Sequence, residues 1–271
     1  MVTQRLMLAS GLRLVVREYG SGVPVLLVHA WGETHRSFDR LVPLLAGHLR
    51  LVVPDQRGAG DSDKPPDGYS LAQSAADLVE LLDALDLTSI FMVGTSSGGY
   101  VAQQISVDHA DRVDGLVLVG SPHSLAGGGD PFGAVLSDLH DPVTLNDVRS
   151  INSAISLDHP VPAQFLADQD QSALTIPPHV WRAAYDGLLT ATPPLDTGRI
   201  TIPTLVLWGA TDEVLPRKQA DDLVAAIPGA RLVVYQGTGH LVLWEQPERV
   251  ASDILSFVVA VTSLGRRDEQ G

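Results

Sequence analysis

A serine between glycines follows directly on an apolar run at residues 91–100, FMVGTSSGGY. Gly94, Ser96 and Gly98 form the pattern G-x-S-x-G, and a helical pattern, YVAQQISV, comes after it. A serine on a sharp strand-to-helix turn exposes its hydroxyl, and such a turn crowds the residues two before and two after it. The pattern therefore predicts Ser96 as a nucleophile; the alternative is a Gly/Ser-rich turn without chemistry.

The adjacent serine, Ser97, fits this pattern less well. For Ser97 the residue two positions earlier would be Thr95, which carries a side chain. As the first residue of the following helix, Ser97 can instead offer its backbone N–H, at the positive end of the helix dipole, to an oxyanion. We therefore expect Ser97 to bind the oxyanion and Ser96 to attack.

A serine nucleophile needs a base, and the base needs an acid that orients it. Asp212 follows the apolar run IPTLVLWG, and His240 follows the apolar run ARLVVYQG. The order serine, acid, histidine along the chain is that of one known class of hydrolases. Each residue has a simpler interpretation, since Asp212 could cap a helix beginning near Pro216 and His240 could be a loop histidine. Their joint placement at strand ends favours a catalytic triad.

Short apolar runs alternate with helical patterns along most of the chain. Continuous Val-, Leu- and Ile-rich runs are typical of strands buried on both faces of a parallel sheet. The pattern therefore predicts an α/β protein with a mostly parallel, doubly wound sheet of about eight strands and helices on both faces. The predicted strands span 12–19 (alternating), 24–30, 49–55, 89–95, 113–121, 202–209 and 230–237, and the clearest helices span 70–87, 216–229 and 245–264. Ser70 and Gln73 form a capping-box pattern at the first of these helices.

This alternation breaks between residues 122 and 200, where prolines are frequent and helical pieces recur. We expect this segment to be a helical cap inserted after the sixth strand. Residues 1–121 and 201–271 then form the core that it covers.

Three side chains of the cap segment are candidates for binding a substrate. Trp181 and Tyr185 stand four residues apart on one predicted helix, so they lie on one face. They either line the pocket or pack the cap against the core. His123 either reaches the pocket or is an ordinary loop histidine.

Composition excludes several classes of protein. The 271-residue chain has a formal net charge of −14, which disfavours binding to nucleic acid or to anionic membranes. It has no cysteine, which excludes disulfides and thiolate metal sites. Its N-terminus lacks the pattern of a secretory signal, and its longest apolar run near the C-terminus, FVVAV, is too short to cross a bilayer. We expect a cytoplasmic protein with a small-molecule substrate; its oligomeric state stays open.

The sequence also lacks the spacings of common cofactor sites. No H-E-x-x-H or calcium-loop pattern occurs, and the segments GSG (20–22) and GAG (58–60) do not continue as phosphate-binding loops. We therefore expect no metal and no cofactor.

Taken together, these segments resemble the α/β-hydrolase fold superfamily over essentially the whole chain. LLVHAWGETHRSFDRLVPLL resembles its H-G-x-G oxyanion loop, VVPDQRGAGDSDKP the segment after the next strand, and VGTSSGG its nucleophile elbow. LWGATDEVLP resembles its G-x-x-D-x-x-x-P acid segment, and GTGHLVLWEQPERV its histidine segment. The register of Gly209 and Pro216 in the acid segment favours Asp212 over the adjacent Glu213 as the acid.

The resemblance also implies a second oxyanion donor. The matching position is the backbone N–H of Trp31, in His29-Ala30-Trp31-Gly32, where the family usually has glycine in place of Ala30. By the same resemblance, His29 is expected to order this loop through hydrogen bonds.

The resemblance implies a cofactor-independent serine hydrolase that works through an acyl-enzyme on Ser96. Serine at this position argues against the related dehalogenases and epoxide hydrolases, which place aspartate there. Hydrolysis of a small, largely uncharged ester or lactone is the favoured reaction, with carbon–carbon bond hydrolysis or perhydrolysis as alternatives. A small-molecule receptor that keeps the triad is a different kind of function. It would need an exposed apolar patch on the cap, and this segment is rich in Asp and Pro instead.

Overall fold

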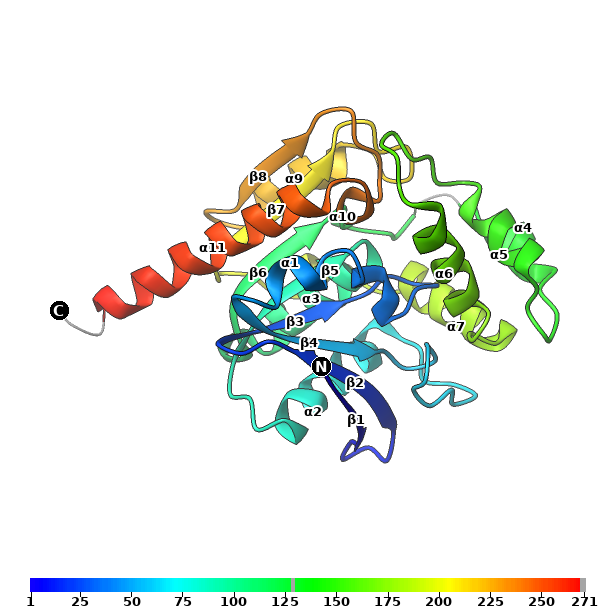
Figure 1. Cartoon of the computed structure of the whole chain (residues 1–271), viewed down its shortest axis with the longest axis horizontal. Coiled ribbons are helices and arrows are strands. Elements are labelled where there is room, and N and C mark those ends of the chain that lie inside the picture. Colours follow the sequence, from blue (N-terminus) through cyan, green and yellow to red (C-terminus); the bar gives the residue numbers. More distant parts are fainter. Residues whose placement is uncertain (128–129, 269–271) are drawn as a thin grey trace.

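The central feature of the computed structural model, which describes residues 1–127 and 130–268, is an eight-stranded sheet (Figure 1). The strand order is β1-β2-β4-β3-β5-β6-β7-β8. The pairs β1–β2 and β2–β4 are antiparallel, and the other five pairs are parallel. The mostly parallel sheet predicted from the sequence is thus confirmed. The strands are β1 (Val2–Met7), β2 (Arg13–Tyr19), β3 (Val23–Val28), β4 (Leu49–Asp55), β5 (Ile90–Thr95), β6 (Val113–Val119), β7 (Thr204–Gly209) and β8 (Arg231–Tyr235).

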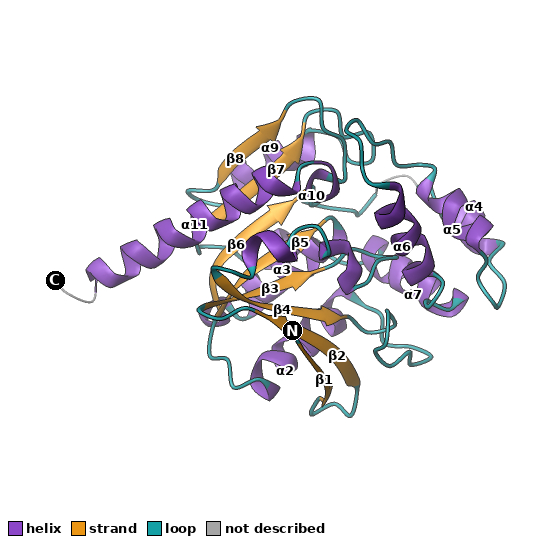
Figure 2. Cartoon of the chain, in the orientation of Figure 1, coloured by secondary structure: helices purple, strands orange, loops and turns teal. Residues whose placement is uncertain are grey.

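Helices cover both faces of the sheet (Figure 2). The α-helices are α1 (Val42–Leu45), α2 (Leu71–Ala84), α3 (Ser97–Asp108), α4 (Gly133–Ser137), α5 (Leu145–Asn152), α6 (Ala163–Ala173), α7 (Pro178–Leu189), α8 (Pro194–Thr197), α9 (Lys218–Ala226), α10 (Val242–Glu245) and α11 (Pro247–Asp268). Two short 3₁₀ helices, η1 (His35–Phe38) and η2 (Ala110–Arg112), complete the set among the described residues.

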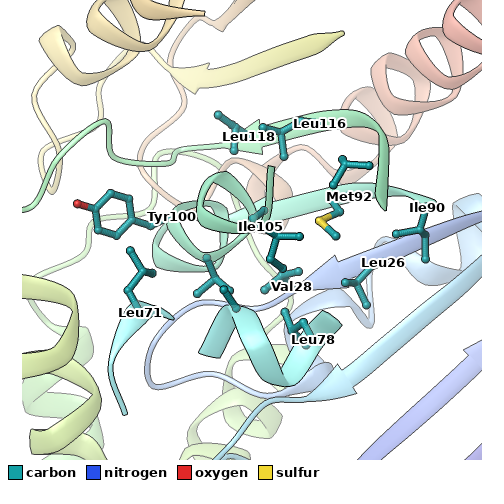
Figure 3. Packing of buried hydrophobic residues seen from close by; sticks show 14 of the residues in the cluster. Leu26, Val28, Leu71, Leu78, Ile90, Met92, Tyr100, Ile105, Leu116 and Leu118 are labelled. Carbon is teal, nitrogen blue, oxygen red and sulfur yellow. The ribbon is translucent and has the colours of Figure 1, made fainter. Parts of the chain in front are cut away.

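The hydrophobic core has one layer on each face of the sheet. On one face α2, α3 and α9 pack on the strands, as Leu78 and Ile105 do against Leu26, Val28 and Met92 (Figure 3). On the other face α1, α10 and α11 form the second layer. Because both faces are covered, every residue of β5 and of β7 is buried. This explains why these strands are continuous apolar runs in the sequence.

Two strands differ from the sequence prediction. β1 was not predicted, because it is a half-exposed edge strand with polar residues and no apolar run. β2 was predicted to alternate, yet Leu14, Val15 and Val16 are all buried. It lies between β1 and β4, and both of its faces are covered at this point.

The helix ends also differ in detail. Ser70 caps α2 by accepting from the Gln73 N–H, but the Gln73 side chain donates to Asp77 instead of returning to the cap, so only half of the capping box forms. The predicted helix at 245–264 is two helices, α10 and α11, which are separated at Gln246. The break falls at the residue before Pro247, where helical backbone is disfavoured.

The segment between β6 and β7 carries the helices α4 to α8. Figure 1 places α4, α5, α6 and α7, in green to yellow-green, beside the sheet. They enclose a third apolar cluster that includes Trp181 and Tyr185. The inserted helical cap is thus present, while its boundaries at 122 and 200 stay a prediction. None of the helices in the described part of the chain has the length and apolarity needed to cross a bilayer.

Candidate active site

Ser96 lies at the sharp turn between β5 and α3. Its backbone has φ 47° and ψ −122°, a conformation that residues other than glycine rarely adopt. The turn is held because the Ser96 N–H donates to the Val119 carbonyl at 2.8 Å and the Gly99 N–H donates to the Ser96 carbonyl at 3.0 Å. Strain of this kind costs about 1–3 kcal/mol and persists only where the surroundings enforce it. The local geometry is that of a nucleophile elbow.

The glycines around Ser96 are needed for close backbone approaches. A Cβ added at Gly94 would lie 2.5 Å from the Gly99 Cα and 2.6 Å from the Gly98 carbonyl oxygen. A Cβ at Gly98 would overlap the carbonyl oxygen of Val28, at the end of β3. Gly94 therefore makes room for α3, as the sequence suggested. Gly98, however, makes room for β3 rather than for Gly94.

Ser96, His240 and Asp212 form one hydrogen-bonded chain. The Ser96 hydroxyl lies 3.0 Å from His240 Nε2, and His240 Nδ1 lies 2.8 Å from Asp212 Oδ2. Ser96 follows β5, Asp212 follows β7 and His240 follows β8. The carboxyl ends of these parallel strands meet at one edge of the sheet. A carboxylate only accepts hydrogen bonds, so His240 Nδ1 carries the proton and Nε2 is free to accept one from Ser96.

The second oxygen of Asp212 fixes the orientation of the carboxylate. Asp212 Oδ1 accepts from the N–H groups of Val214 and Leu215, each at 2.9 Å. These bonds form a loop turn ahead of α9, which begins only at Lys218, so Asp212 is not the cap of that helix. The adjacent Glu213 is exposed and contacts the Ser156 hydroxyl at 3.4 Å.

The loop that carries His240 is held by Glu245, a residue that the sequence analysis did not single out. Glu245 is 6% exposed. Its Oε1 accepts from the Gly239 N–H at 3.0 Å, and its Oε2 accepts from the N–H groups of Asp158 and His159 at 2.9 and 2.8 Å. One carboxylate therefore ties the histidine loop to the cap segment. The signal in the sequence was a lone acidic residue inside an apolar stretch, VLWEQP.

The loop after β3 is ordered by His29, as the resemblance implied. The Gln56 N–H donates to His29 Nε2 at 3.0 Å, so His29 Nδ1 carries the proton and donates to the Ala30 carbonyl at 2.8 Å. Burial lowers the pKa of His29, which keeps the imidazole neutral. In the same loop the Ala30 N–H donates to the Glu33 carboxyl at 3.1 Å, and burial raises the pKa of Glu33.

The two expected oxyanion donors lie side by side, but they are not equivalent. Ser97 is the first residue of α3, where backbone N–H groups have no partner within the helix. The Trp31 N–H is already engaged, because it donates to the side-chain Oγ of Ser97 at 2.7 Å. This bond was not predicted from the sequence.

A cavity of about 960 Å³ opens beside the triad, between the sheet edge and the cap. Ser96 and His240 line it together with Trp31, Trp181 and Tyr185. The centroid of the Trp31 ring lies 4.9 Å from the ring centroid of Trp181 and 4.9 Å from that of Tyr185, so these aromatic rings form one wall of the cavity. The structure thus brings both predicted cap aromatics to the cavity.

His123 does not reach this cavity. Its neighbours Pro122 and Ser124 are among the described residues that line it, but His123 is not. The N–H groups of His123 and Ser124 both donate to Gln219 Oε1, which fixes the backbone here. The structure therefore does not bring His123 together with Ser96 and His240 among the described residues that line this cavity.

The charged groups that line the cavity are mainly acidic. They include Asp130 and Asp170, and the Arg149 guanidinium pairs with Asp170 at 3.2 Å. Burial, with Asp130 nearby, raises the pKa of Tyr185 to about 12, so its phenol stays protonated. Among the side chains of residues 1–127 and 130–264, no three His, Asp or Glu are grouped in a way that could hold a metal ion.

Comparison with known proteins decides the family. Residues 25–253 match the alpha/beta hydrolase family. The chain belongs to this family. The esterase RhEst1 from Rhodococcus sp. ECU1013 is 25% identical with a TM-score of 0.85, over 96% of this chain and 100% of the esterase.

Two other relatives of this alpha/beta hydrolase differ in their named activities. The structure of Est816, described as an N-acyl homoserine lactone degrading enzyme, is 29% identical with a TM-score of 0.76, over 91% of this chain and 97% of that one. The 2-hydroxymuconate semialdehyde hydrolase of Pseudomonas putida is 28% identical over 96% of this chain and 95% of that enzyme. The family is therefore shared by relatives with esterase, lactone-degrading and semialdehyde-hydrolase names.

Proposed function

We propose that this alpha/beta hydrolase cleaves a largely uncharged carboxylic ester or lactone through an acyl-enzyme on Ser96. The observation that carries the proposal is the hydrogen-bonded chain from Ser96 through His240 to Asp212, which opens onto the large cavity. The esterase and the lactone-degrading enzyme among the relatives support the same reaction class.

In the proposed first step, Ser96 Oγ attacks the carbonyl carbon while His240 Nε2 takes the serine proton. His240 then gives this proton to the leaving alcohol oxygen. Asp212 keeps the proton on Nδ1 and stabilises the imidazolium that forms. In the second step His240 takes a proton from water, the resulting hydroxide equivalent attacks the acyl carbon, and Ser96 leaves with the proton returned.

Each step develops negative charge on the former carbonyl oxygen. The Ser97 N–H, at the start of α3, is placed to bind that charge, while the Trp31 N–H, the other expected donor, is engaged by Ser97 Oγ. Donors of this kind are usually the largest single contribution to catalysis.

The cavity supports a substrate larger than the sequence suggested. About 960 Å³ lies at the upper end of the range for drug-sized ligands. Apolar side chains such as Ile155 and Leu166, and the aromatic wall at Trp31, suit a medium-length acyl chain or an aromatic group. No metal or cofactor takes part in the proposed reaction.

Carbon–carbon bond hydrolysis is the second candidate, favoured by the similarity to the semialdehyde hydrolase. By its name, the substrate of that relative is a carboxylate. Among the described residues that line the cavity here, the single Lys or Arg is Arg149, which is paired with Asp170. A cavity with more carboxylates than cations repels an anionic substrate. An uncharged ester or lactone is therefore favoured over a carboxylate as the substrate.

Hydrolysis of p-nitrophenyl esters, from acetate to decanoate, tests the proposal with wild type and Ser96→Ala side by side. We expect wild-type turnover with an optimum at medium chain length and a loss of three or more decades in Ser96→Ala. An N-acyl homoserine lactone series run in parallel separates lactone from ester preference.

Two results would contradict the proposal. Near-normal turnover by Ser96→Ala would show that Ser96 is not the nucleophile. Wild-type inactivity on both series, together with turnover of a vinylogous diketone, would favour the carbon–carbon hydrolase.

A further inference from the structure

The bond between the Trp31 N–H and Ser97 Oγ occupies one of the two expected oxyanion donors. At 2.7 Å it is as short as the bond that an oxyanion itself would make to this N–H. Trp31 and Ser97 line the same cavity as Ser96, and Ser97 is only 8% exposed. Because Ser97 directly follows Ser96 and both line this cavity, the Ser97 hydroxyl belongs to the same site, and it engages the Trp31 N–H that a substrate oxygen would otherwise meet.

The direction of this bond leaves the hydroxyl proton of Ser97 available. The backbone N–H is the donor and Oγ is the acceptor, so the hydroxyl proton points away from Trp31 N. Within residues 1–127 and 130–268, no hydrogen bond engages this proton or the Ser97 N–H. Ser97 thus holds two free donors beside Ser96, one from the backbone and one from the side chain.

The Trp31 loop is too well anchored to withdraw from Ser97. The Ala30 N–H is bound by Glu33, and the Glu33 N–H donates back to the Ala30 carbonyl at 3.2 Å. The Trp31 indole N–H donates to the Trp181 carbonyl at 3.0 Å. On the other side, Gly98 lies directly against the carbonyl groups at the end of β3. These contacts fix the spacing between the Trp31 N–H and the start of α3.

We propose that the Ser97 hydroxyl is itself an oxyanion donor, placed between the Trp31 N–H and the substrate. In this arrangement Trp31 donates to Ser97 Oγ, and the Ser97 hydroxyl and backbone N–H both donate to the oxyanion. No proton is transferred along this relay. The inference rests on the proposed acyl-enzyme chemistry at Ser96, and it replaces the direct contact between Trp31 and the oxyanion that the family resemblance implied.

The arrangement has a physical advantage over a hydroxyl that acts alone. A hydroxyl that accepts a hydrogen bond becomes a stronger donor, because neighbouring hydrogen bonds polarise one another. The donor would also be aligned before the substrate arrives, since Trp31 holds Oγ in place, and preorganised donors need no reorganisation during the reaction.

The test compares Ser97→Ala with Ser97→Thr on p-nitrophenyl acetate. Alanine keeps the backbone N–H and removes the hydroxyl, whereas threonine keeps both. We expect kcat of Ser97→Ala to fall about 100- to 1000-fold, the usual loss for one oxyanion donor, with little change in KM. Ser97→Thr should recover most of this loss.

Inhibition by phenylboronic acid is a second measurement, and it would not change if the Ser97 hydroxyl had only a structural role. Its adduct with the nucleophilic serine is a tetrahedral anion, so Ser97→Ala should weaken its inhibition by about the same factor as kcat falls. If Ser97→Ala does not fold, Ser97→Cys, which keeps the shape but offers only a weak donor, takes its place in both assays.

Two outcomes would overturn the relay. If Ser97→Ala keeps kcat within tenfold of wild type, or exceeds it, the hydroxyl only competes with the substrate for Trp31. If Ser97→Thr falls as far as Ser97→Ala, the size of the side chain matters and the hydroxyl does not. A failure of the proposed function itself would be distinct, because Ser96→Ala would then stay active.

Discussion

Asp212→Asn should inactivate the protein without unfolding it, and the hydrogen bonds of Asp212 explain why. The N–H groups of Val214 and Leu215 both point at Oδ1. An asparagine must keep its carbonyl oxygen on that side, because turning the amide would leave two backbone donors facing an NH₂ group. Leaving two such donors unsatisfied costs about 2–6 kcal/mol in all. The amide NH₂ is therefore forced towards His240.

This orientation gives His240 the wrong tautomer. Facing an NH₂ group, Nδ1 must accept a hydrogen bond, so the proton moves to Nε2, which can then no longer accept the proton of Ser96. The same change in a serine protease triad lowers kcat about 10⁴-fold, or about 5 kcal/mol of transition-state stabilisation. We expect a loss of that order in kcat on p-nitrophenyl esters, with KM and the unfolding midpoint in urea close to wild type.

Glu213→Gln is the matched control, since it makes the same chemical change at the adjacent, exposed carboxylate. It should keep wild-type kcat. If Asp212→Asn retains kcat within tenfold of wild type, or if Glu213→Gln loses as much as Asp212→Asn, Asp212 does not set the tautomer of His240.

Three further predictions concern stability and the shape of the cavity. Gly98→Ala should lower the free energy of unfolding by about 1–3 kcal/mol, because its Cβ would overlap the Val28 carbonyl; an unchanged urea midpoint would contradict this. Trp181→Ala should cost about 3–5 kcal/mol and move the optimum in the p-nitrophenyl ester series towards bulkier acyl groups, whereas an unchanged chain-length profile would place Trp181 outside the acyl site. His29 has its pKa lowered by burial, so the folded state binds fewer protons than the unfolded state below about pH 6.5, the ordinary histidine value, and stability falls as the pH drops through that range. His29→Gln, which keeps an acceptor for the Gln56 N–H, should flatten that part of the curve of unfolding free energy against pH; an unchanged slope would assign the acid sensitivity to other groups.

The placement of the triad could be predicted because each member carries a local signal. The glycines around Ser96 mark a tight turn, and Asp212 and His240 directly follow apolar runs that had to be strands. Parallel strands bring their carboxyl ends to one edge, so the order along the chain was enough to predict proximity. The mostly parallel sheet followed from the same runs.

Contacts between distant segments could not be predicted in this way. The bond from the Trp31 N–H to Ser97 Oγ joins residues 66 positions apart, and it depends on how closely the loop after β3 approaches α3. Likewise, Glu245 shows its role only once the histidine loop and the cap segment lie together. The choice left open for His123 likewise depended on a distant segment, since Gln219 holds the backbone at His123.

The cap was the least predictable part for a related reason. Its helices were visible as pieces, but the cavity forms between them and the sheet, and its size depends on side chains from many segments. The half-exposed edge strand β1 was missed because it has no continuous apolar run and its pairing with β2 decides its structure.

Covalent labelling identifies the nucleophile by direct chemistry. An alkyl fluorophosphonate reacts with an activated serine hydroxyl, and fragmentation mass spectrometry of the labelled peptide distinguishes Ser96 from Ser97. We expect one label per chain on Ser96 and none in Ser96→Ala. A label on Ser97, or equal labelling of Ser96→Ala and wild type, would show that the hydrogen-bonded chain from Ser96 to Asp212 is not the reacting centre.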